Sequence, residues 1–470
     1  MTWIKSGLLP GNKRIRMKGF VLTTFMALII SLAPGQATSR HVVLISIDGF
    51  RPEMFQDSTW PTPNLQWLMK RGVYARHMKS VFPAYTHPSH AAMETGALPA
   101  RSGICFNQPK NSHGEWYWYY DSIKAPTVWA AFRIAGLTTA AVMWPNVVDG
   151  PITYNLGEIW DVDHPNDRAT PVRRHAIPKG IYEEIERNAT GLLDSNCMND
   201  ETFRMDENTG RMAAYIFQTY RPNFLALHFA CVDGFQHEYG RDHDSVRLAA
   251  AANDRAIGDV LDAIVHSGVK DSTTVIIVGD HGFSDFHEVF RPNMLIKSLG
   301  GRFIAAGGST FLYRKTGDNQ PTDAQLIQQV KDSLDLLPKD KRDLFRIVDR
   351  RELDRLGADS AALMALAAKP GLVFSGAITK SAIVTQGPGT MIQQSPMEGV
   401  FIQAHGGHHG YDPNEPQMYT GFIAWGAGVA KGRVIPELSV VDIAPLVAAL
   451  LEVPFTCPDG KLVPGILSTE

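Results

Sequence analysis

Three aspartates, Asp48, Asp233 and Asp280, each follow a short apolar run of the kind that predicts a buried β-strand. The carboxyl ends of parallel strands meet along one edge of a sheet, and ligands bind there. We therefore expect the three carboxylates to lie close together, although they are far apart in the chain. A single aspartate at such a position commonly caps the next helix, so the prediction depends on the three occurring together.

Histidines accompany these aspartates. One follows Asp233 four residues later, another follows Asp280 directly, and a later group includes His405, His408 and His409. An isolated histidine is more often a surface or capping residue, but mixed Asp and His donors are a set that suits Zn²⁺. Calcium would need more oxygen ligands. The pattern therefore indicates zinc.

A candidate nucleophile lies in the segment from Phe82 to Gly96. The segment predicts a strand, a turn and a helix that begins near Pro88, which places Thr86 at the helix N-terminus. Unpaired backbone N–H groups and the helix dipole favour an anion there. A threonine hydroxyl is a weak nucleophile until a metal ion or a base activates it. On this segment alone, Thr86 or Ser89 is equally well interpreted as an N-cap.

In their order and spacing, these pieces resemble the nucleotide pyrophosphatase/phosphodiesterase family of the alkaline phosphatase superfamily. The resemblance extends from residue 41 to about residue 412, and the ordered set is far more specific than any one motif. The matching pieces are Ile45-Ser-Ile-Asp48-Gly49, Phe82-Pro-x-x-Thr86-x-Pro-x-His90, Gly96-x-x-Pro-x-x-x-Gly103-Ile104, Asp233-x-x-x-His237, Gly279-Asp-His-Gly282 and His409-Gly-Tyr-Asp412.

The resemblance implies two Zn²⁺ ions and a set of ligands for each. The ligands of one ion would be Asp48, Thr86, Asp280 and His281, and those of the other Asp233, His237 and His409. His409 is preferred to His408 because it directly precedes Gly-Tyr-Asp. Asn107 matches the family's asparagine that directs its amide at a phosphate oxygen.

The implied chemistry is zinc-dependent cleavage of a phosphodiester or phosphoanhydride bond. Thr86 would attack phosphorus and form a phosphothreonine intermediate, which water then hydrolyses. Asn107 and the backbone N–H of Thr86 would stabilise charge on a non-bridging oxygen. No separate general base is required.

Three features bear on the substrate. His87 stands where nucleotide-cleaving relatives often carry an aromatic residue that helps to hold the base, which weakens the expectation of a nucleotide. The run Trp116-Tyr-Trp-Tyr-Tyr120 is either a stacking wall or core packing. Trp144-Pro145-Asn146 replaces the Lys-x-Arg clamp of certain monoesterases, which favours diesters. Nucleotides, glycerophosphodiesters and lipid head groups all stay open as small-molecule substrates.

Two alternative functions remain. A phosphonate hydrolase, similar to phosphonoacetate hydrolase, also uses a metal-bound threonine, but it would need positive groups that recognise a carboxylate. A non-catalytic ligand-binding relative would be expected to have lost at least one metal ligand. A sulfatase is disfavoured because Thr86 occupies the position of a convertible Cys or Ser.

These residues need a fold that brings them to one edge of a sheet. Apolar strands alternate with helices, which predicts an α/β fold: a doubly wound, mostly parallel sheet with helices on both faces. Strands are expected at 41–47, 138–144, 224–232, 273–278 and 421–425, and helices at 62–72, 126–135, 244–267 and 440–451.

Two regions break this alternation. Residues 151–200 predict a long irregular excursion, and residues 312–398 predict an inserted cap. The core would then comprise residues 38–311 and 399–470. Within the cap, helices are expected at 322–336 and 341–356, and strands at 371–374 and 381–384.

The N-terminus predicts export. A basic region is followed by the apolar run 19–33 and by small residues before Ala37, which is typical of a secretory leader over residues 1–37. The run is short for a spanning helix, although an uncleaved anchor is the alternative. We expect a periplasmic or secreted protein whose translation starts at Met1 or Met17.

Composition adds little beyond a large globular protein. The net charge of −3 and the even spread of basic residues predict neither a nucleic-acid nor a membrane-surface partner. The four cysteines include no Cys-x-x-Cys pair. Cys197 and Cys457 are the candidates for a disulfide, and Cys231 is expected to be a buried free thiol inside a strand.

Overall fold

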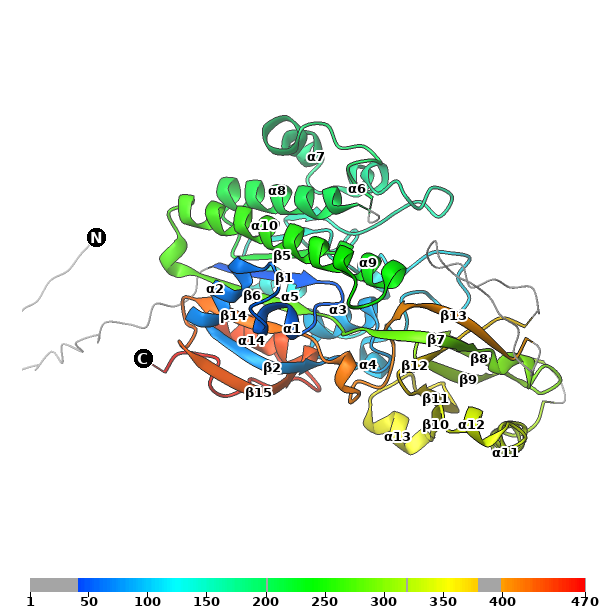
Figure 1. Ribbon diagram of the computed structural model, residues 1–470. Coiled ribbons are helices and arrows are strands. Elements are labelled where there is room, and N and C mark those ends of the chain that lie inside the picture. The colour runs from blue at the N-terminus through cyan, green and yellow to red at the C-terminus, as the bar shows by residue number, and fades with distance from the viewer. Residues whose placement is uncertain (1–40, 200–201, 318–319, 379–398, 470) are drawn as a thin grey trace, which may run out of the picture. The chain divides into compact units, whose positions relative to one another are not determined.

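An eight-stranded sheet with the strand order β15-β2-β14-β6-β1-β5-β3-β4 forms the centre of the fold (Figure 1). β14 runs antiparallel to both of its neighbours, and the other pairs are parallel. This confirms the predicted mostly parallel sheet. Its strands are β1 (His41–Ile47), β2 (Val73–Lys79), β3 (Thr139–Val142), β4 (Tyr154–Leu156), β5 (Phe224–Phe229), β6 (Thr273–Gly279), β14 (Phe422–Gly426) and β15 (Arg433–Ser439).

The computed structural model describes residues 41–199, 202–317, 320–378 and 399–469. The predicted leader and the predicted strand at 381–384 lie outside the described residues. Within the described ranges, no helix is both long enough and apolar enough to cross a membrane.

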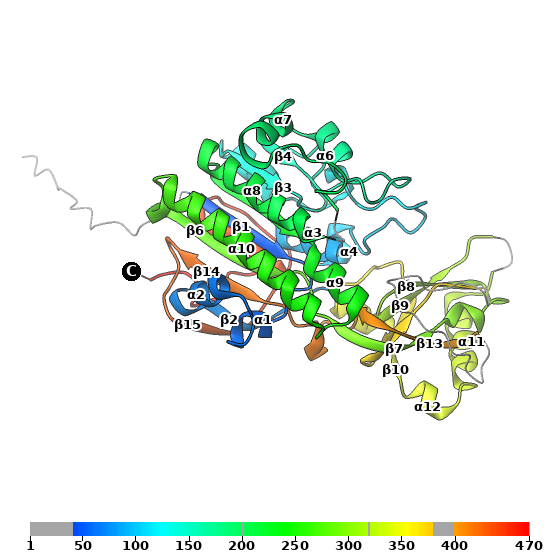
Figure 2. The same ribbon diagram turned by 45° about the horizontal axis from the view of Figure 1, so that its top comes forward.

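Helices cover both faces of the central sheet because its strands are apolar on both sides. In β1, Val43 and Ile45 belong to the core cluster that includes α2, α8 and α10, whereas Val42 and Leu44 belong to the cluster that includes α3, α5 and α14. Both views show α8 and α10 side by side over one face (Figures 1 and 2). These helices are α2 (Pro63–Arg71), α3 (Thr86–Thr95), α5 (Val128–Ile134), α8 (Phe203–Tyr220), α10 (Asp244–His266) and α14 (Ile443–Leu450).

Two smaller sheets lie beyond α9, at one end of the central sheet (Figures 1 and 2). An antiparallel sheet has the order β10-β11-β9-β8, and a mixed sheet has the order β12-β7-β13. The predicted cap contributes to both, together with strands on either side of it. Their strands are β7 (Ser284–Phe290), β8 (Gly301–Ala306), β9 (Ser309–Arg314), β10 (Phe345–Val348), β11 (Met364–Ala368), β12 (Gly371–Phe374) and β13 (Phe401–His408).

The remaining helices are shorter. They are α1 (Glu53–Gln56), α4 (Pro99–Ser102), α6 (Ala169–His175), α7 (Ile181–Ile185), α9 (Cys231–Tyr239), α11 (Asp323–Asp335), α12 (Lys339–Arg342) and α13 (Arg350–Arg355). The prediction of an irregular excursion at 151–200 is wrong in part, because β4, α6 and α7 lie there. Val172, Ile181 and Ile185 are buried in the core cluster under α8, which holds these elements in place.

Two predicted elements are wrong. The expected strand at 224–232 ends at Phe229, and α9 starts at Cys231, because the carboxylate of Asp206 accepts the N–H groups of Ala230 and Cys231 at 3.0 and 2.9 Å. The expected helix at 341–356 is interrupted by β10, which pairs with β11.

All four cysteines are free, so the candidate disulfide between Cys197 and Cys457 is not formed. Cys231 is a buried free thiol as expected, but it begins helix α9 and does not lie in a strand. Its thiol donates a hydrogen bond to the carbonyl of Thr202 at 2.9 Å.

Candidate active site and metal clusters

The N-terminus of α3 meets the carboxyl ends of β1 and β6. Thr86 is the first residue of α3, Asp48 directly follows β1, and Asp280 directly follows β6. The hydroxyl of Thr86 lies 3.5 Å from Oδ2 of Asp48 and 3.4 Å from Nε2 of His281. The strands and the helix therefore place Asp48, Asp280 and Thr86 as expected, except that α3 starts at Thr86, two residues earlier than the predicted start near Pro88.

His281 is the centre of this first cluster. Its Nε2 lies 3.2 Å from Oδ1 of Asp48 and 3.4 Å from Oδ2 of Asp280. Burial lowers the pKa of His281 to about 4, so the ring is neutral at neutral pH. Its Nδ1 faces the carbonyl of Gly282 at 3.2 Å and must donate there, which leaves the lone pair on Nε2. The other oxygen of Asp280 accepts the backbone N–H groups of Gly49 and His281.

A second cluster adjoins the first. Asp233 and His237 are one turn apart on α9, and His409 follows β13. Oδ2 of Asp233 lies 3.3 Å from Nε2 of His237, and its Oδ1 lies 3.7 Å from Nε2 of His409. The rings of His409 and His281 stack with centroids 3.7 Å apart, which joins the two clusters. The structure thus brings the seven predicted ligands together.

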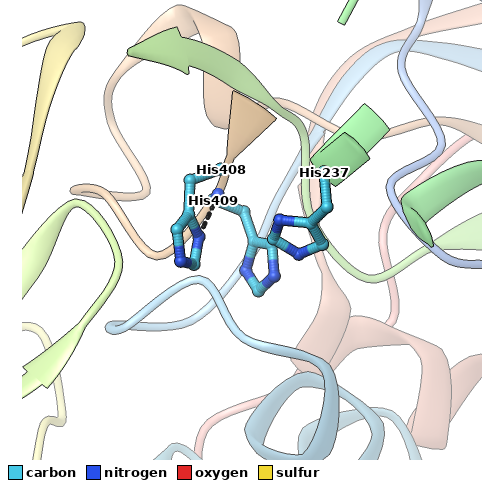
Figure 3. Close-up of side chains that lie close together, drawn as sticks. All are labelled: His237, His408 and His409. Carbon is cyan, nitrogen blue, oxygen red and sulfur yellow. Dashed lines mark hydrogen bonds between the residues drawn. The ribbon is translucent and has the colours of Figure 1, made fainter. Parts of the chain in front are cut away.

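The imidazole orientations in the second cluster match those in the first. Nδ1 of His237 donates to the carbonyl of Gly407 at 3.0 Å, and Nδ1 of His409 donates to the carbonyl of Ala84 at 2.9 Å. Figure 3 shows these two rings next to each other, with His408 on the other side of His409. A metal-binding histidine usually donates its other ring nitrogen in this way, because that fixes the ring and presents the lone pair.

These donors fit metal ions. Zinc–ligand distances of about 2.0–2.1 Å place the corners of a tetrahedron about 3.3–3.4 Å apart. The neighbouring donor atoms around His281 are 3.2–3.5 Å apart. Burial, followed by the charges of Asp233 and Asp280, raises the pKa of Asp48 well above its usual range. Buried carboxylates that repel one another beside imidazole lone pairs are the environment in which a bound cation is favourable.

Asn107 lies at the edge of the first cluster. Its Oδ1 accepts the backbone N–H of His87 at 3.0 Å, so its amide NH₂ is the part left to bind another group. Asn107 and Thr86 both line a cavity of about 700 Å³, whose wall also includes Asp48 of the first cluster and all three residues of the second.

The side chain of His87 is fully buried and is held by Asn146. Nδ1 of His87 donates to Oδ1 of Asn146 at 2.7 Å, and the amide of Asn146 donates to the carbonyl of His87 at 3.0 Å. The residue after Thr86 therefore offers no surface to a ligand. Its ring packs edge-on against Trp116, with centroids 5.2 Å apart, and Trp116 lines the cavity.

The aromatic run at 116–120 was expected to be either a stacking wall or core packing, and its residues do both. Trp116 contributes to the cavity wall, whereas Trp118 is buried in the core. Trp160 packs edge-on against both of them, and it too lines the cavity. The guanidinium of Arg168 lies over the ring of Trp160, 4.2 Å from its centroid.

Sequence reasoning missed several polar groups around the site. Glu158 and Arg168 reach the cavity from the region that was expected to be irregular, where no periodic pattern marked them. His228 lies with its Nε2 3.4 Å from Oδ2 of Asp48. A histidine inside the otherwise apolar β5 was the signal that could have identified it. His408 also lines the cavity, although the sequence pattern favours His409 as the ligand.

Comparisons with known proteins agree with this geometry. Residues 42–412 match the family model "Type I phosphodiesterase / nucleotide pyrophosphatase". The human ectonucleotide pyrophosphatase/phosphodiesterase family member 7 is 23% identical over 95% of this chain and 89% of its own length. The mouse bis(5'-adenosyl)-triphosphatase enpp4 is 26% identical over 57% of this chain and 53% of its own length.

Among solved structures, an inactive form of murine ectonucleotide pyrophosphatase/phosphodiesterase 5 in complex with AMP has a similar fold. It aligns with a TM-score of 0.66 at 19% identity and covers 91% of this chain and 100% of its own. The family match spans most of the chain and contains the residues that form both clusters. This chain therefore belongs to the type I phosphodiesterase/nucleotide pyrophosphatase family and is a hydrolase that acts on phosphoric diesters.

Proposed function

We propose that this protein is a two-zinc phosphodiesterase and nucleotide pyrophosphatase that forms a covalent intermediate on Thr86. The observation that carries the proposal is the convergence of Thr86 with the donors of Asp48, Asp280 and His281 at 3.2–3.5 Å. Mixed carboxylate and imidazole donors favour zinc over calcium or magnesium. Bound at the two clusters, zinc ions would activate the Thr86 hydroxyl and stabilise the oxygen that leaves phosphorus.

The protein's own groups then act in sequence. The Thr86 hydroxyl releases its proton to solvent, and Oγ1 forms a bond to phosphorus while the bond to the leaving oxygen breaks and that oxygen keeps the electron pair. The amide NH₂ of Asn107, held in place by its bond to His87, donates to a non-bridging oxygen as charge develops there. Water later displaces Thr86 from phosphorus and restores its hydroxyl.

The hydrogen bonds of Asn146 support a diester in preference to a monoester. A monoester transfers a more negative group, which superfamily members bind with additional cationic side chains at this point of the fold. Here Asn146 is fully buried, and both ends of its amide are bonded to His87. The segment therefore positions the residue next to the nucleophile and supplies no cation.

Nucleotides are the substrates that the comparisons support best. One relative is named a bis(5'-adenosyl)-triphosphatase, and one similar structure contains AMP. Although His87 is buried, Trp116 and Trp160 present aromatic surface to the cavity. The relatives are named as ectoenzymes, which agrees with export of this chain through its predicted leader.

A paired rate assay on the zinc-loaded protein tests the proposal. A p-nitrophenyl phosphodiester should be hydrolysed in strong preference to p-nitrophenyl phosphate. Thr86→Ala should lower kcat by at least about 10³-fold, because it removes the nucleophile. Mass spectrometry of the acid-quenched wild type should find the phosphoryl adduct on the peptide that contains Thr86.

Ser89→Ala is the matched control, because Ser89 lies on the same helix and its hydroxyl is hydrogen-bonded to the buried hydroxyl of Ser80 at 2.9 Å. It should keep most of the activity. A preference for the monoester would contradict the role assigned to Asn146, and an active Thr86→Ala enzyme would exclude Thr86 as the nucleophile.

A further inference from the structure

His408 has no role in the proposed mechanism, yet it lines the cavity beside the second cluster. It is the last residue of β13, and its ring centroid lies 4.8 Å from that of His237 and 5.2 Å from that of His409 (Figure 3). One ring nitrogen from each of the three histidines lies within 4.8 Å of the others, so distance alone would make His408 a third metal ligand.

Hydrogen bonding separates His408 from its two neighbours. Nδ1 of His237 and Nδ1 of His409 each face a backbone carbonyl and donate to it. Nδ1 of His408 instead accepts the backbone N–H of His409 at 2.9 Å. An imidazole nitrogen that accepts a hydrogen bond carries no proton, so the proton of His408 is on Nε2. That nitrogen is a hydrogen-bond donor and has no lone pair for a metal ion.

The turn between β8 and β9 holds this ring in place. Gly307 has φ +57°, and a Cβ there would lie 2.7 Å from Nδ1 of His408 and 2.1 Å from the carbonyl oxygen of His409. That carbonyl also accepts the N–H of Gly308 at 2.9 Å. The ring of His408 is therefore packed on its Nδ1 side. The same strand β8 places Arg302, an exposed cation, on the cavity wall.

We infer that Nε2–H of His408 donates a hydrogen bond to the leaving group and, with Arg302, favours a leaving group that carries phosphate oxygens. This inference rests on the proposed function, in which the cluster of Asp233, His237 and His409 faces the leaving oxygen. A phosphate or polyphosphate leaving group offers acceptor oxygens to both donors. A neutral alcohol offers few, and a quaternary ammonium head group would be repelled by Arg302.

No proton is transferred through the hydrogen bond from His408 in this step. The bond between phosphorus and the leaving oxygen breaks, the oxygen keeps the electron pair, and His408 keeps its proton while it stabilises the developing charge. His408 thereby differs from a general acid, and the substrates most affected are those whose leaving group has phosphate oxygens beyond the scissile bond.

Two substrates that transfer the same group test this inference. Thymidine 5'-triphosphate and p-nitrophenyl thymidine 5'-phosphate both transfer the thymidylyl group, but the first releases pyrophosphate and the second nitrophenolate. His408→Ala should lower kcat/KM for the triphosphate by about 10- to 100-fold, the range for a lost hydrogen bond to a charged group. The nitrophenyl ester should change by less than about threefold, because its leaving group carries no phosphate oxygens and its nitro oxygens are weak acceptors.

Two further variants and a metal assay complete the test. His408→Gln keeps an N–H donor and should recover part of the activity on the triphosphate. His405→Ala is the matched control, because His405 lies on the same strand but is exposed, and it should leave both rates unchanged. Elemental analysis should find the same zinc content in His408→Ala as in the wild type.

Three results would overturn the inference: loss of zinc from His408→Ala, an equal loss of activity on both substrates, or a wild type that cleaves the nitrophenyl ester but not the triphosphate. Failure of the proposed function looks different. In that case the zinc-loaded wild type would cleave neither substrate, and the inference would fall with it.

Discussion

At the scale of single residues, the partner of each ring nitrogen decides what a histidine in this site can do. His237, His281 and His409 each direct Nδ1 at a carbonyl oxygen and Nε2 at a carboxylate. His90 differs, because its Nδ1 faces the carbonyl of Thr86 and its Nε2 faces the hydroxyl of Ser46. A buried histidine such as His90, whose ring nitrogens both have uncharged partners, supports the structure, whereas a histidine that donates Nδ1 to a carbonyl and turns Nε2 toward a carboxylate is a candidate to bind a metal ion.

Asn107 gives a prediction at the same scale. Asn107→Ala should lower kcat by about 10²-fold, since one donor to a developing oxyanion contributes that much in comparable sites. KM should change less, because the hydrogen bond from Asn107 to the phosphate oxygen strengthens only as charge develops. Steady-state kinetics on the p-nitrophenyl diester measures both constants.

The zinc content of Asn107→Ala should equal that of the wild type, because Asn107 contacts His87 and is not in either cluster. A rise in KM at constant kcat would show that Asn107 binds the ground state only and does not stabilise the transition state.

At the scale of elements, strand ends supply four of the seven proposed ligands, and helices α3 and α9 supply the other three. α3 begins at Thr86, and α9 carries Asp233 and His237 on one face because they are four residues apart. α9 begins where it does because Asp206, on α8, accepts two of its first backbone N–H groups. The long helix behind the sheet thus determines where two of the proposed metal ligands point.

Helix α3 also buries Glu94, which provides a prediction for stability. Glu94 is 2% exposed and accepts a hydrogen bond from the indole N–H of Trp129. Burial raises the pKa of Glu94 well above its usual range, and the bond to Trp129 offsets only part of this. The folded state therefore holds the proton more tightly than the unfolded state. The stability that the protonated Glu94 carboxyl contributes is fully present below its pKa in the unfolded protein. It is lost as pH rises through its pKa in the folded protein.

Glu94→Gln keeps an acceptor for Trp129 but cannot ionise. Its Tm should match that of the wild type in acid and exceed it by a few degrees at about pH 8. Thermal unfolding across this pH range measures the difference. A difference that stays constant with pH would mean that the carboxyl does not titrate in the folded protein.

At the scale of the whole molecule, the site is assembled from segments that only the complete fold brings together. The first cluster comes from β1, α3 and β6, and the second from α9 and the end of β13. The ring of His409 donates to Ala84, which is 325 residues away in the chain. Removal of the proposed metal ions should therefore destabilise the fold as a whole.

Metal removal gives the prediction for this scale. Dialysis against a chelator should lower Tm, because bound ions offset the mutual repulsion of Asp48, Asp233 and Asp280. At a zinc concentration of about 1,000 times Kd, one site contributes about 4 kcal/mol to the free energy of unfolding. Differential scanning calorimetry should show recovery on addition of zinc but not of calcium. An unchanged Tm would mean that the clusters are empty in the isolated protein.

The sequence by itself determined the strands that lead to Asp48 and Asp280, the helix whose N-terminus carries Thr86, with its start predicted two residues late, and the family. These features depend on contiguous apolar runs and on the order of short motifs, which are local properties of the chain. The sequence also indicated the residue types that surround the site, without their orientations.

Only the tertiary structure decided that Asp233 lies on a helix, that His87 is buried, that the cysteines are free, and that His408 and His409 differ in which ring nitrogen carries the proton. Each depends on a hydrogen-bond partner or a packing surface from a distant segment: Asp206 for α9, Asn146 for His87, and Ala84 for His409. A pattern of neighbouring residues carries no information about such partners, because they come together only when the sheets and helices pack.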